Sequence, residues 1–235
     1  MTGILEICQE AADVTATKRP DDLFNKNVEH DTIFLAVAKN ELDSLMRFGH
    51  WQELMKEGVF RTVKGKTVYR IEEIVPDFYA LSNNTIFIKD LHEKIYGAVT
   101  SEQWAREKYF VEPNSQIKFK IQNDCFKFLT PPPEGVKIVF EYRSNTICLD
   151  AQTLEEKSVL TKNSDIPIFD KYLVKLGIIW RWLKRGGLDY TEEYEEYRKE
   201  LKKKFGTGLS CEDISPAAGG GVLSQPLNIT VINRG

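Results

Sequence analysis

Two stretches of helical hydrophobic periodicity lie between residues 164 and 205, and they differ in kind. In the first, apolar residues at i, i+3 and i+4 spacing cover most of the circumference, which is typical of a helix buried on nearly all sides. In the second, they form one narrow stripe and the other faces are charged. The pattern predicts a central helix and then a helix with a free polar face, separated by Gly186-Gly187. The apolar positions are Phe169, Tyr172, Leu173, Leu176, Ile179, Trp180 and Leu183, then Tyr190, Tyr194, Tyr197, Leu201 and Phe205.

The N-terminal part of the chain has the same period. A short helix is predicted at about 3–17, and a longer one from about 27 or 31 to residue 50. Residues 18–22, which include a proline, break the pattern between them.

From residue 59 the period changes to two, the spacing of half-buried strands. Residues 59–63 and 66–71 read as a β-hairpin around a Lys-Gly-Lys turn, and 84–88 as a further strand. A short helix is predicted at 100–108 with Thr100 as its N-cap.

Three cleanly alternating segments follow, at 117–122, 125–129 and 136–145. Such alternation predicts a meander with one buried face. The three prolines at 131–133 cannot donate to a ladder and must lie in the loop before its last strand.

This order of elements predicts an α+β fold: a helical bundle formed by the N- and C-terminal helices, with an inserted small antiparallel β domain and an extended C-terminal tail. We expect the bundle at 1–58 and 160–206, the β-rich insertion at 59–159, and a flexible linker with a β-prone arm at 207–235.

The arm has strand-like composition, but no hairpin partner is evident in the sequence. An exposed unpaired strand invites edge pairing, so strand addition to a partner is its expected use, with a disordered terminus as the alternative. The residues assigned to this arm are Val222, Leu223, Leu227, Ile229, Val231 and Ile232.

Composition restricts the class of protein. The 235 residues carry a formal net charge of −3 with 42% hydrophobic and 29% charged residues, ordinary for a soluble globular protein. We expect no signal peptide and no membrane span, since no apolar run approaches about 20 residues. The four widely spaced cysteines then predict reduced thiols in a cytosolic setting.

Catalytic and cofactor motifs are absent from the sequence. The three histidines have no His or Cys at metal-ligand spacing, and there is no GxSxG elbow. Gly219-Gly220-Gly221 precedes strand residues and not a helix N-terminus, so it does not read as a phosphate loop. We therefore expect no enzyme, no cofactor and no metal.

A cluster of basic residues lies at the C-terminal end of the last predicted helix. Cations at a helix C-terminus complement the macrodipole, which is the simpler interpretation. The alternative is a DNA-channel or inter-subunit surface that arises when many copies assemble. The cluster consists of Arg198, Lys199, Lys202, Lys203 and Lys204.

Four segments together resemble a known family. Residues 4–14, 42–63, 126–145 and 164–201 follow the pattern of the head-to-tail adaptor (tail accessory, or head-completion) proteins of short-tailed bacteriophages with elongated capsids. The resemblance covers roughly residues 3–205. Its most specific part is Asp-Ile-Pro at 165–167, then Leu-Gly-Ile-Ile-Trp-Arg-Trp at 176–182 and the Gly-Leu-Asp-Tyr turn.

The resemblance implies a non-enzymatic virion protein of the phage neck, assembled in the bacterial cytoplasm. Such adaptors form a ring, typically of twelve copies, beneath the portal protein. They extend the channel through which packaged double-stranded DNA passes without sequence specificity, and they support nozzle and tail fibre proteins. By the same resemblance the C-terminal arm would grip the portal and the β insertion would face outward.

Two other classes of protein stay open. A tail-tube or nozzle protein would have a much larger β content. A soluble cytosolic α+β enzyme or ligand-binding protein would need a convergent polar pocket in the β domain.

Overall fold

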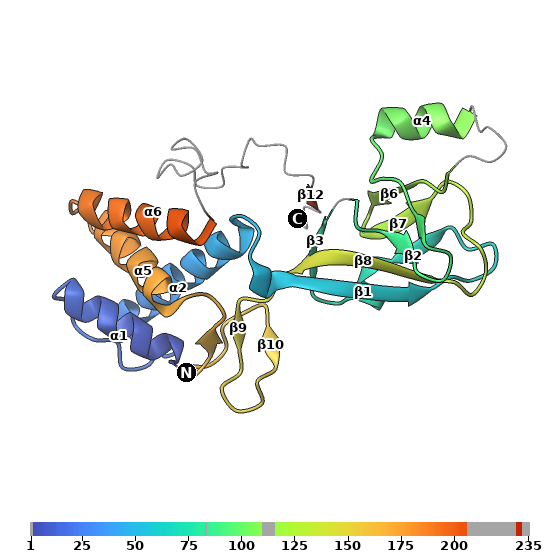
Figure 1. The fold of residues 1–235 in the computed structure, drawn as a ribbon. Helices are drawn as coiled ribbons and strands as arrows, with labels where there is room; N and C mark the ends of the chain where they lie inside the picture. Colours follow the sequence, from blue (N-terminus) through green and yellow to red (C-terminus); the bar gives the residue numbers. More distant parts are fainter. Residues whose placement is uncertain (1, 83, 110–115, 206–228, 232–235) are drawn as a thin grey trace. The chain divides into compact units, whose positions relative to one another are not determined.

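The computed structural model describes residues 2–82, 84–109, 116–205 and 229–231 (Figure 1). It confirms the predicted α+β class. The chain divides into two units. The helical unit consists of Met1–Glu53 and Thr146–Gln225, and the β unit of Leu54–Asn145 and Pro226–Gly235.

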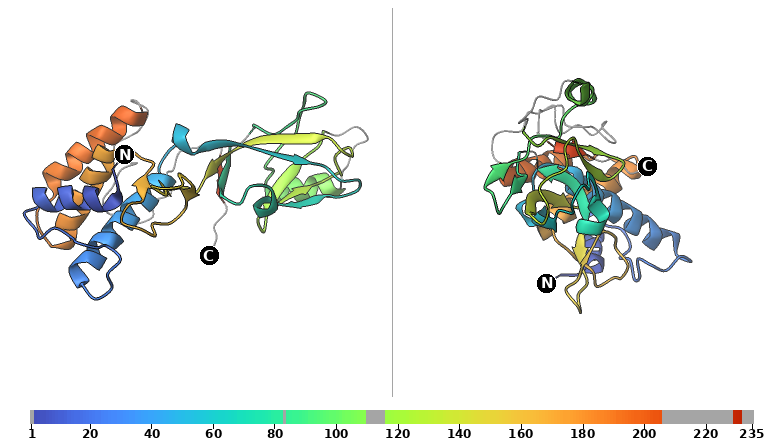
Figure 2. Two further views of the ribbon diagram at one scale, coloured as in Figure 1. Left: turned by 90° about the horizontal axis from the view of Figure 1, so that it is seen from below. Right: turned by 90° about the vertical axis from the view of Figure 1, so that its right-hand side faces the viewer.

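Helix α5 is the centre of the helical unit and packs against α1, α2 and α6 (Figures 1 and 2). Its N-cap is Asp170, whose carboxylate accepts hydrogen bonds from the amides of Tyr172 (3.0 Å) and Leu173 (3.1 Å). From Leu173 to Trp180, every residue except Lys175 is buried, as the all-round apolar pattern predicted. The helices are α1 (Ile4–Val14), α2 (Glu29–Arg47), α5 (Lys171–Arg185) and α6 (Thr191–Phe205).

Aromatic rings fill the spaces between these helices. Phe34 of α2 stacks on Trp182 of α5 with ring centroids 4.0 Å apart. Trp51, just after α2, contacts both Phe169 (5.1 Å) and Phe205 (4.7 Å). Residues from both ends of the sequence therefore build one core, which is the closure that the helical pattern predicted.

A small sheet in the helical unit holds the buried carboxylate of Asp165. This side chain accepts hydrogen bonds from Lys157 Nζ (2.5 Å) and from the amides of Thr161 (2.7 Å) and Lys162 (2.9 Å). The main-chain carbonyl of Asp165 accepts from the amide of Ile4 (2.8 Å), which ties the loop to the start of α1. The sheet has the order β10-β9-β11, with strands β9 (Cys148–Leu149), β10 (Glu156–Lys157) and β11 (Ile166–Pro167).

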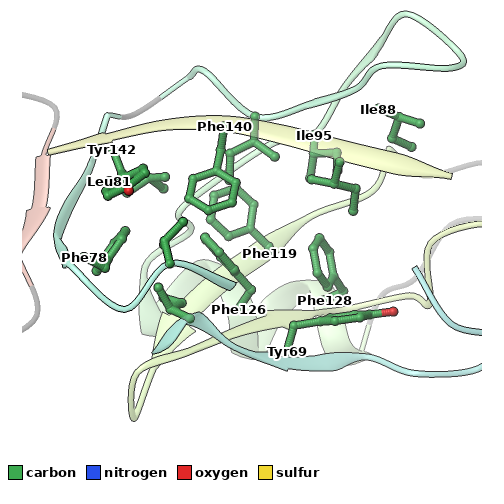
Figure 3. Close-up of a cluster of buried hydrophobic side chains, with 14 residues drawn as sticks. Tyr69, Phe78, Leu81, Ile88, Ile95, Phe119, Phe126, Phe128, Phe140 and Tyr142 are labelled. Atoms are coloured by element: carbon green, nitrogen blue, oxygen red, sulfur yellow. The ribbon is translucent and has the colours of Figure 1, made fainter. Parts of the chain in front are cut away.

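The β unit has a larger and a smaller sheet with a core between them (Figure 3). The larger sheet runs β12-β3-β8-β4-β5, and β1 pairs with β8 outside this path. The smaller runs β2-β7-β6. The strands are β1 (Met55–Arg61), β2 (Val68–Arg70), β3 (Phe78–Ser82), β4 (Phe87–Ile88), β5 (Glu93–Lys94), β6 (Phe119–Gln122), β7 (Cys125–Phe128), β8 (Lys137–Ser144) and β12 (Ile229–Val231).

Aromatic side chains dominate this core. Phe140 of β8 contacts Phe126 of β7 edge to face, with centroids 5.0 Å apart. Phe119 of β6 lies 5.8 Å from Phe126. Gly58 of β1 is opposite Phe140, and a Cβ there would come within 2.4 Å of its ring, so only glycine fits.

Short helices complete the β unit, together with a one-turn element at its border. These are η1 (Gln52–Leu54), α3 (Ile71–Ile74) and α4 (Ser101–Tyr109). The predicted cap of α4 is confirmed: Thr100 Oγ1 accepts from the Gln103 amide (3.2 Å), and Gln103 Oε1 accepts from the Thr100 amide (3.1 Å).

The predicted strand pairings were partly wrong. Strands β6 and β7 pair as expected, but β8 leaves that meander for the other sheet, where it pairs with β1, β3 and β4. Likewise β1 and β2 form no hairpin with each other, because β1 pairs with β8 and β2 with β7. Alternation identifies a strand with one buried face, but two sheets that share one core offer that face equally well.

The unit boundaries also differ from those expected. The division lies at 53/54 and 145/146, whereas the sequence suggested 58/59 and 159/160. Strands β9 and β10 belong to the helical unit because they pair in one sheet with β11, directly before α5. The predicted linker at 207–228 lies outside the described residues.

Candidate functional site

The basic cluster lies on α6 as predicted, but its charges are largely paired. Arg198 Nη1 lies 2.8 Å from Glu195, and Lys203 forms an ion pair with Glu200. Lys204 reaches Asp170 at the N-cap of α5, at 3.4 Å. Lys199 is exposed, and Lys202 is half-buried. A single copy therefore presents less unbalanced positive charge than the run of basic residues suggests.

The tyrosine stripe of α6 is a packing surface, as the helical spacing predicted. Tyr194 and Tyr197 are 7% and 5% exposed. Their rings lie against Trp180 of α5, at centroid distances of 5.1 and 6.0 Å. These rings are not available to stack on nucleic-acid bases.

A buried polar cluster joins α2, α5 and α6, and the sequence pattern did not reveal it. The carboxylate of Glu41, on α2, is fully buried. It accepts hydrogen bonds from Arg181 Nε of α5 (2.6 Å) and from the Tyr197 hydroxyl of α6 (2.8 Å). The signal in the sequence was an acid within the apolar stripe of α2, beside Leu42.

Close packing holds this carboxylate in place. Gly177 of α5 lies directly against it: a Cβ at this position would be 2.0 Å from the Glu41 carboxyl carbon. Burial raises the pKa of Glu41, and the attraction of Arg181 and the two hydrogen bonds counteract part of that rise. The cluster favours one particular packing of α2, α5 and α6, because loss of any partner leaves a buried polar group unpaired.

The buried Tyr197 hydroxyl should therefore matter more than an exposed one. We expect Tyr197→Phe to lower the free energy of unfolding by about 1–3 kcal/mol, because it removes a hydrogen bond to a buried carboxylate. Tyr172→Phe is the matched control: its hydroxyl bonds to Glu196 at the surface, and Tyr172 is 42% exposed. Urea unfolding followed by tryptophan fluorescence measures both, and equal losses in the two variants would contradict the assignment.

The C-terminal arm has a partner strand within its own chain, so it is not the unpaired element that the sequence suggested. Strand β12 pairs antiparallel with β3, with Ile229 opposite Ser82, Thr230 opposite Leu81 and Val231 opposite Ala80. Among the arm residues, only the main chains of Ile229 and Val231 are described; Val222, Leu223, Leu227 and Ile232 lie outside the described residues. The sequence missed the pairing because about 150 residues separate the two strands.

The position of β3 explains why it accepts a further strand. Its other edge pairs with β8, with a bulge between Phe78 and Ala80. Without β12, the remaining edge would expose a row of main-chain amides and carbonyls. This edge is a strand-accepting site that β12 covers in the single chain.

The part of the chain that the structure describes (residues 2–82, 84–109, 116–205 and 229–231) contains few groups suited to catalysis or metal binding. It holds no group of three or more His, Cys, Asp or Glu side chains able to bind a metal ion. His30 Nδ1 lies 3.1 Å from Asp31 at the start of α2. Burial raises the pKa of the Cys8 and Cys148 thiols to about 12, so both stay protonated and poorly nucleophilic near neutral pH. Cys211 lies outside the described residues.

Neither the family models nor the curated proteins provide a relative of this chain. Within the described residues, no helix is long and apolar enough to cross a bilayer. A scan against protein-family models finds no match to the chain, and a search among curated proteins finds no similar sequence.

Proposed function

We propose that the protein is a structural head-to-tail connector adaptor of a short-tailed phage. In this proposal it forms a ring, of twelve copies by the family pattern, that binds beneath the portal protein. The ring extends the channel for packaged double-stranded DNA and provides the platform for nozzle and tail fibre proteins. The observation that carries the proposal is the resemblance of residues 164–201 to the adaptor family.

That segment contains the residues that organise the helical unit. It includes the buried Asp165, the helix α5 with Gly177, and most of α6. A family pattern concentrated on such packing residues supports a shared fold first. Because a fold alone does not imply a function, the proposed role rests on the family resemblance itself.

The pairing of β12 with β3 supports the proposal that the C-terminal arm binds the portal by strand addition. Main-chain hydrogen bonds supply the affinity in this mode of recognition, so an arm that pairs with its own β3 edge can pair with another sheet edge. In the proposed mechanism β12 leaves β3 and adds to the portal. The neighbouring copies in a ring multiply a modest single contact into a stable assembly.

The test measures binding of this chain to the portal ring of the same phage. We expect the full chain to form a ring on the portal, visible by electron microscopy. Deletion of residues 219–235 should reduce binding by at least about tenfold, the effect of losing some 1.4 kcal/mol per contact. Size-exclusion chromatography with and without portal provides the quantitative readout.

A disulfide between β3 and β12 tests whether release of the arm, and not only its presence, is needed for portal binding. Ser82→Cys with Ile229→Cys places two cysteines directly opposite in the β3–β12 register, where Cα atoms about 4.5–5.5 Å apart permit a disulfide. Oxidation should abolish portal binding and reduction should restore it, with Ser82→Cys alone as the matched control. Binding that survives both the deletion and the lock would reject the arm as the portal contact. A chain that stays monomeric with the portal present would reject the connector proposal itself.

A further inference from the structure

The larger sheet of the β unit has an outward face that the connector proposal does not use. Strand β1 pairs with β8 over its whole length, from Met55 opposite Arg143 to Arg61 opposite Lys137. Gly58 and Phe140 form an inward pair, since Phe140 is a core residue. Because side chains alternate along a strand, residues 57, 59 and 61 of β1 and 137, 139 and 141 of β8 point outward.

Charges on this outward face lie in two like-sign rows. Glu57 is directly opposite Glu141 across the strand pair, and Arg61 is directly opposite Lys137. Like charges in opposite positions destabilise a sheet. The structure thus has two unfavourable pairs on one face, although exchanging one residue of each would have made both pairs favourable.

An apolar row separates the acidic row from the basic row. Val59 of β1 is opposite Val139 of β8, and Val139 is opposite Phe87 of β4 on its other side. Val59 is 46% and Phe87 38% exposed. Along β1 and β8 the face therefore reads acidic, apolar, basic, and Phe87 of β4 extends the apolar row to a third strand.

We propose that this face binds the same face of a second copy of the chain. A two-fold axis that lies between the two sheets, along the apolar row, places apolar row on apolar row and reverses the strand direction. The operation brings Glu57 of one copy over Arg61 of the other on β1, and Glu141 over Lys137 on β8. Each row of like charges then meets a row of opposite charge, and the contact is self-complementary, as an isologous interface must be.

Charge complementarity identifies the occupant as a second copy. An acidic ligand such as DNA would meet repulsion at the Glu57/Glu141 row, and a basic ligand would meet repulsion at the Arg61/Lys137 row. A copy of the same face satisfies both rows at once and covers Val59 and Phe87. Face-to-face packing of two sheets with nearly aligned strands is also a common arrangement of β proteins.

The contact is small, so the dimer should be weak and sensitive to salt. A standard stable interface buries about 800 Å² on each partner, and three short rows offer less than that. The four cross-interface ion pairs are exposed at the rim, where salt screens them. This inference does not depend on the connector proposal, because it concerns the isolated chain without a portal.

Charge inversion tests the proposed dimer by sedimentation equilibrium of the isolated chain at low and high salt. Glu57→Lys/Glu141→Lys makes the face wholly basic, and Arg61→Glu/Lys137→Glu makes it wholly acidic. We expect each variant alone to associate at least about tenfold more weakly than the natural chain, and an equimolar mixture of the two to recover association. The matched control is Glu72→Lys/Glu73→Lys on α3, an equal charge change at two exposed positions, which should leave association unchanged.

Three results would overturn the proposal. One is a natural chain that stays monomeric up to about 1 mM, which would place the free energy of association above about −4 kcal/mol. The second is a dimer that survives both inversions. The third is a mixture of the two variants that stays monomeric while circular dichroism shows both to be folded.

Discussion

Replacing Gly177 with alanine should destabilise the helical unit by about 2–4 kcal/mol, although alanine is the better helix former. The new methyl group would lie 2.0 Å from the carboxyl carbon of Glu41, which is fully buried between Arg181 and Tyr197. Either the helices separate or the carboxylate leaves its two donors, and each outcome is unfavourable. Urea unfolding followed by tryptophan fluorescence measures the loss, since Trp51, Trp180 and Trp182 all lie in this unit.

A second glycine of the same helix provides the control. A Cβ at Gly186, the C-cap of α5, would make only ordinary contacts of 3.5 Å or more, and its backbone is already helical. Gly186→Ala should therefore stay within about 0.5 kcal/mol of the natural chain or stabilise it slightly. The double variant Glu41→Ala/Gly177→Ala should lose less than the sum of the two single losses, because the clash disappears with the carboxylate. A Gly177→Ala variant as stable as Gly186→Ala would contradict the packing described.

Replacing Asp165 with alanine should cost about 3–5 kcal/mol at neutral pH. The substitution leaves Lys157 and two main-chain amides without their buried acceptor. Asp21→Ala is the matched control: its carboxylate forms a surface ion pair with Lys18 at 3.6 Å, and such pairs contribute little. Chemical unfolding of the natural chain and the two variants measures the difference. Similar stabilities would show that the loop tolerates these donors without their acceptor.

The same carboxylate should make the helical unit sensitive to acid. Burial opposes ionisation of Asp165, but the Lys157 ammonium and the amides of Thr161 and Lys162 outweigh it and lower the pKa of the side chain. A pKa lowered by folding contributes stability above the unfolded value of about 3.9, and this stability is lost as the pH falls through the folded pKa. Asp165→Asn should therefore lose less stability than the natural chain between neutral pH and about pH 3. Parallel pH profiles of the two proteins would refute the assignment.

Local patterns predicted the elements whose contacts lie close in sequence. The apolar circumference of α5 and the stripe of α6 were both evident from periodicity, and the N-cap at Thr100 was evident from its position before the first turn of α4. The basic cluster on α6 was placed correctly for the same reason. Its pairing with Asp170, 34 residues away, was not predictable, because no local rule relates the two positions.

Long-range pairing was decided by the tertiary structure. In the sequence, Glu41 is one polar residue within an apolar stripe. Only the folded structure shows that α5 and α6 place Arg181 and Tyr197 within hydrogen-bond distance of it. The alternation of β1, β2 and β8 identified strands without saying which sheet each joins. The acidic, apolar and basic rows exist only through the β1–β8 register.

By itself, the sequence determined the α+β class, the five longer helices, about half of the strands and the family resemblance behind the connector proposal. Each of these depends on the spacing of residues within a few turns or along one strand. Only the tertiary structure decided that β12 covers the β3 edge, that Asp165 and Glu41 are buried with donors, and that one sheet face has rows of like charge. The physical reason is that these features depend on which distant segments share a core, and many pairings satisfy the same local pattern.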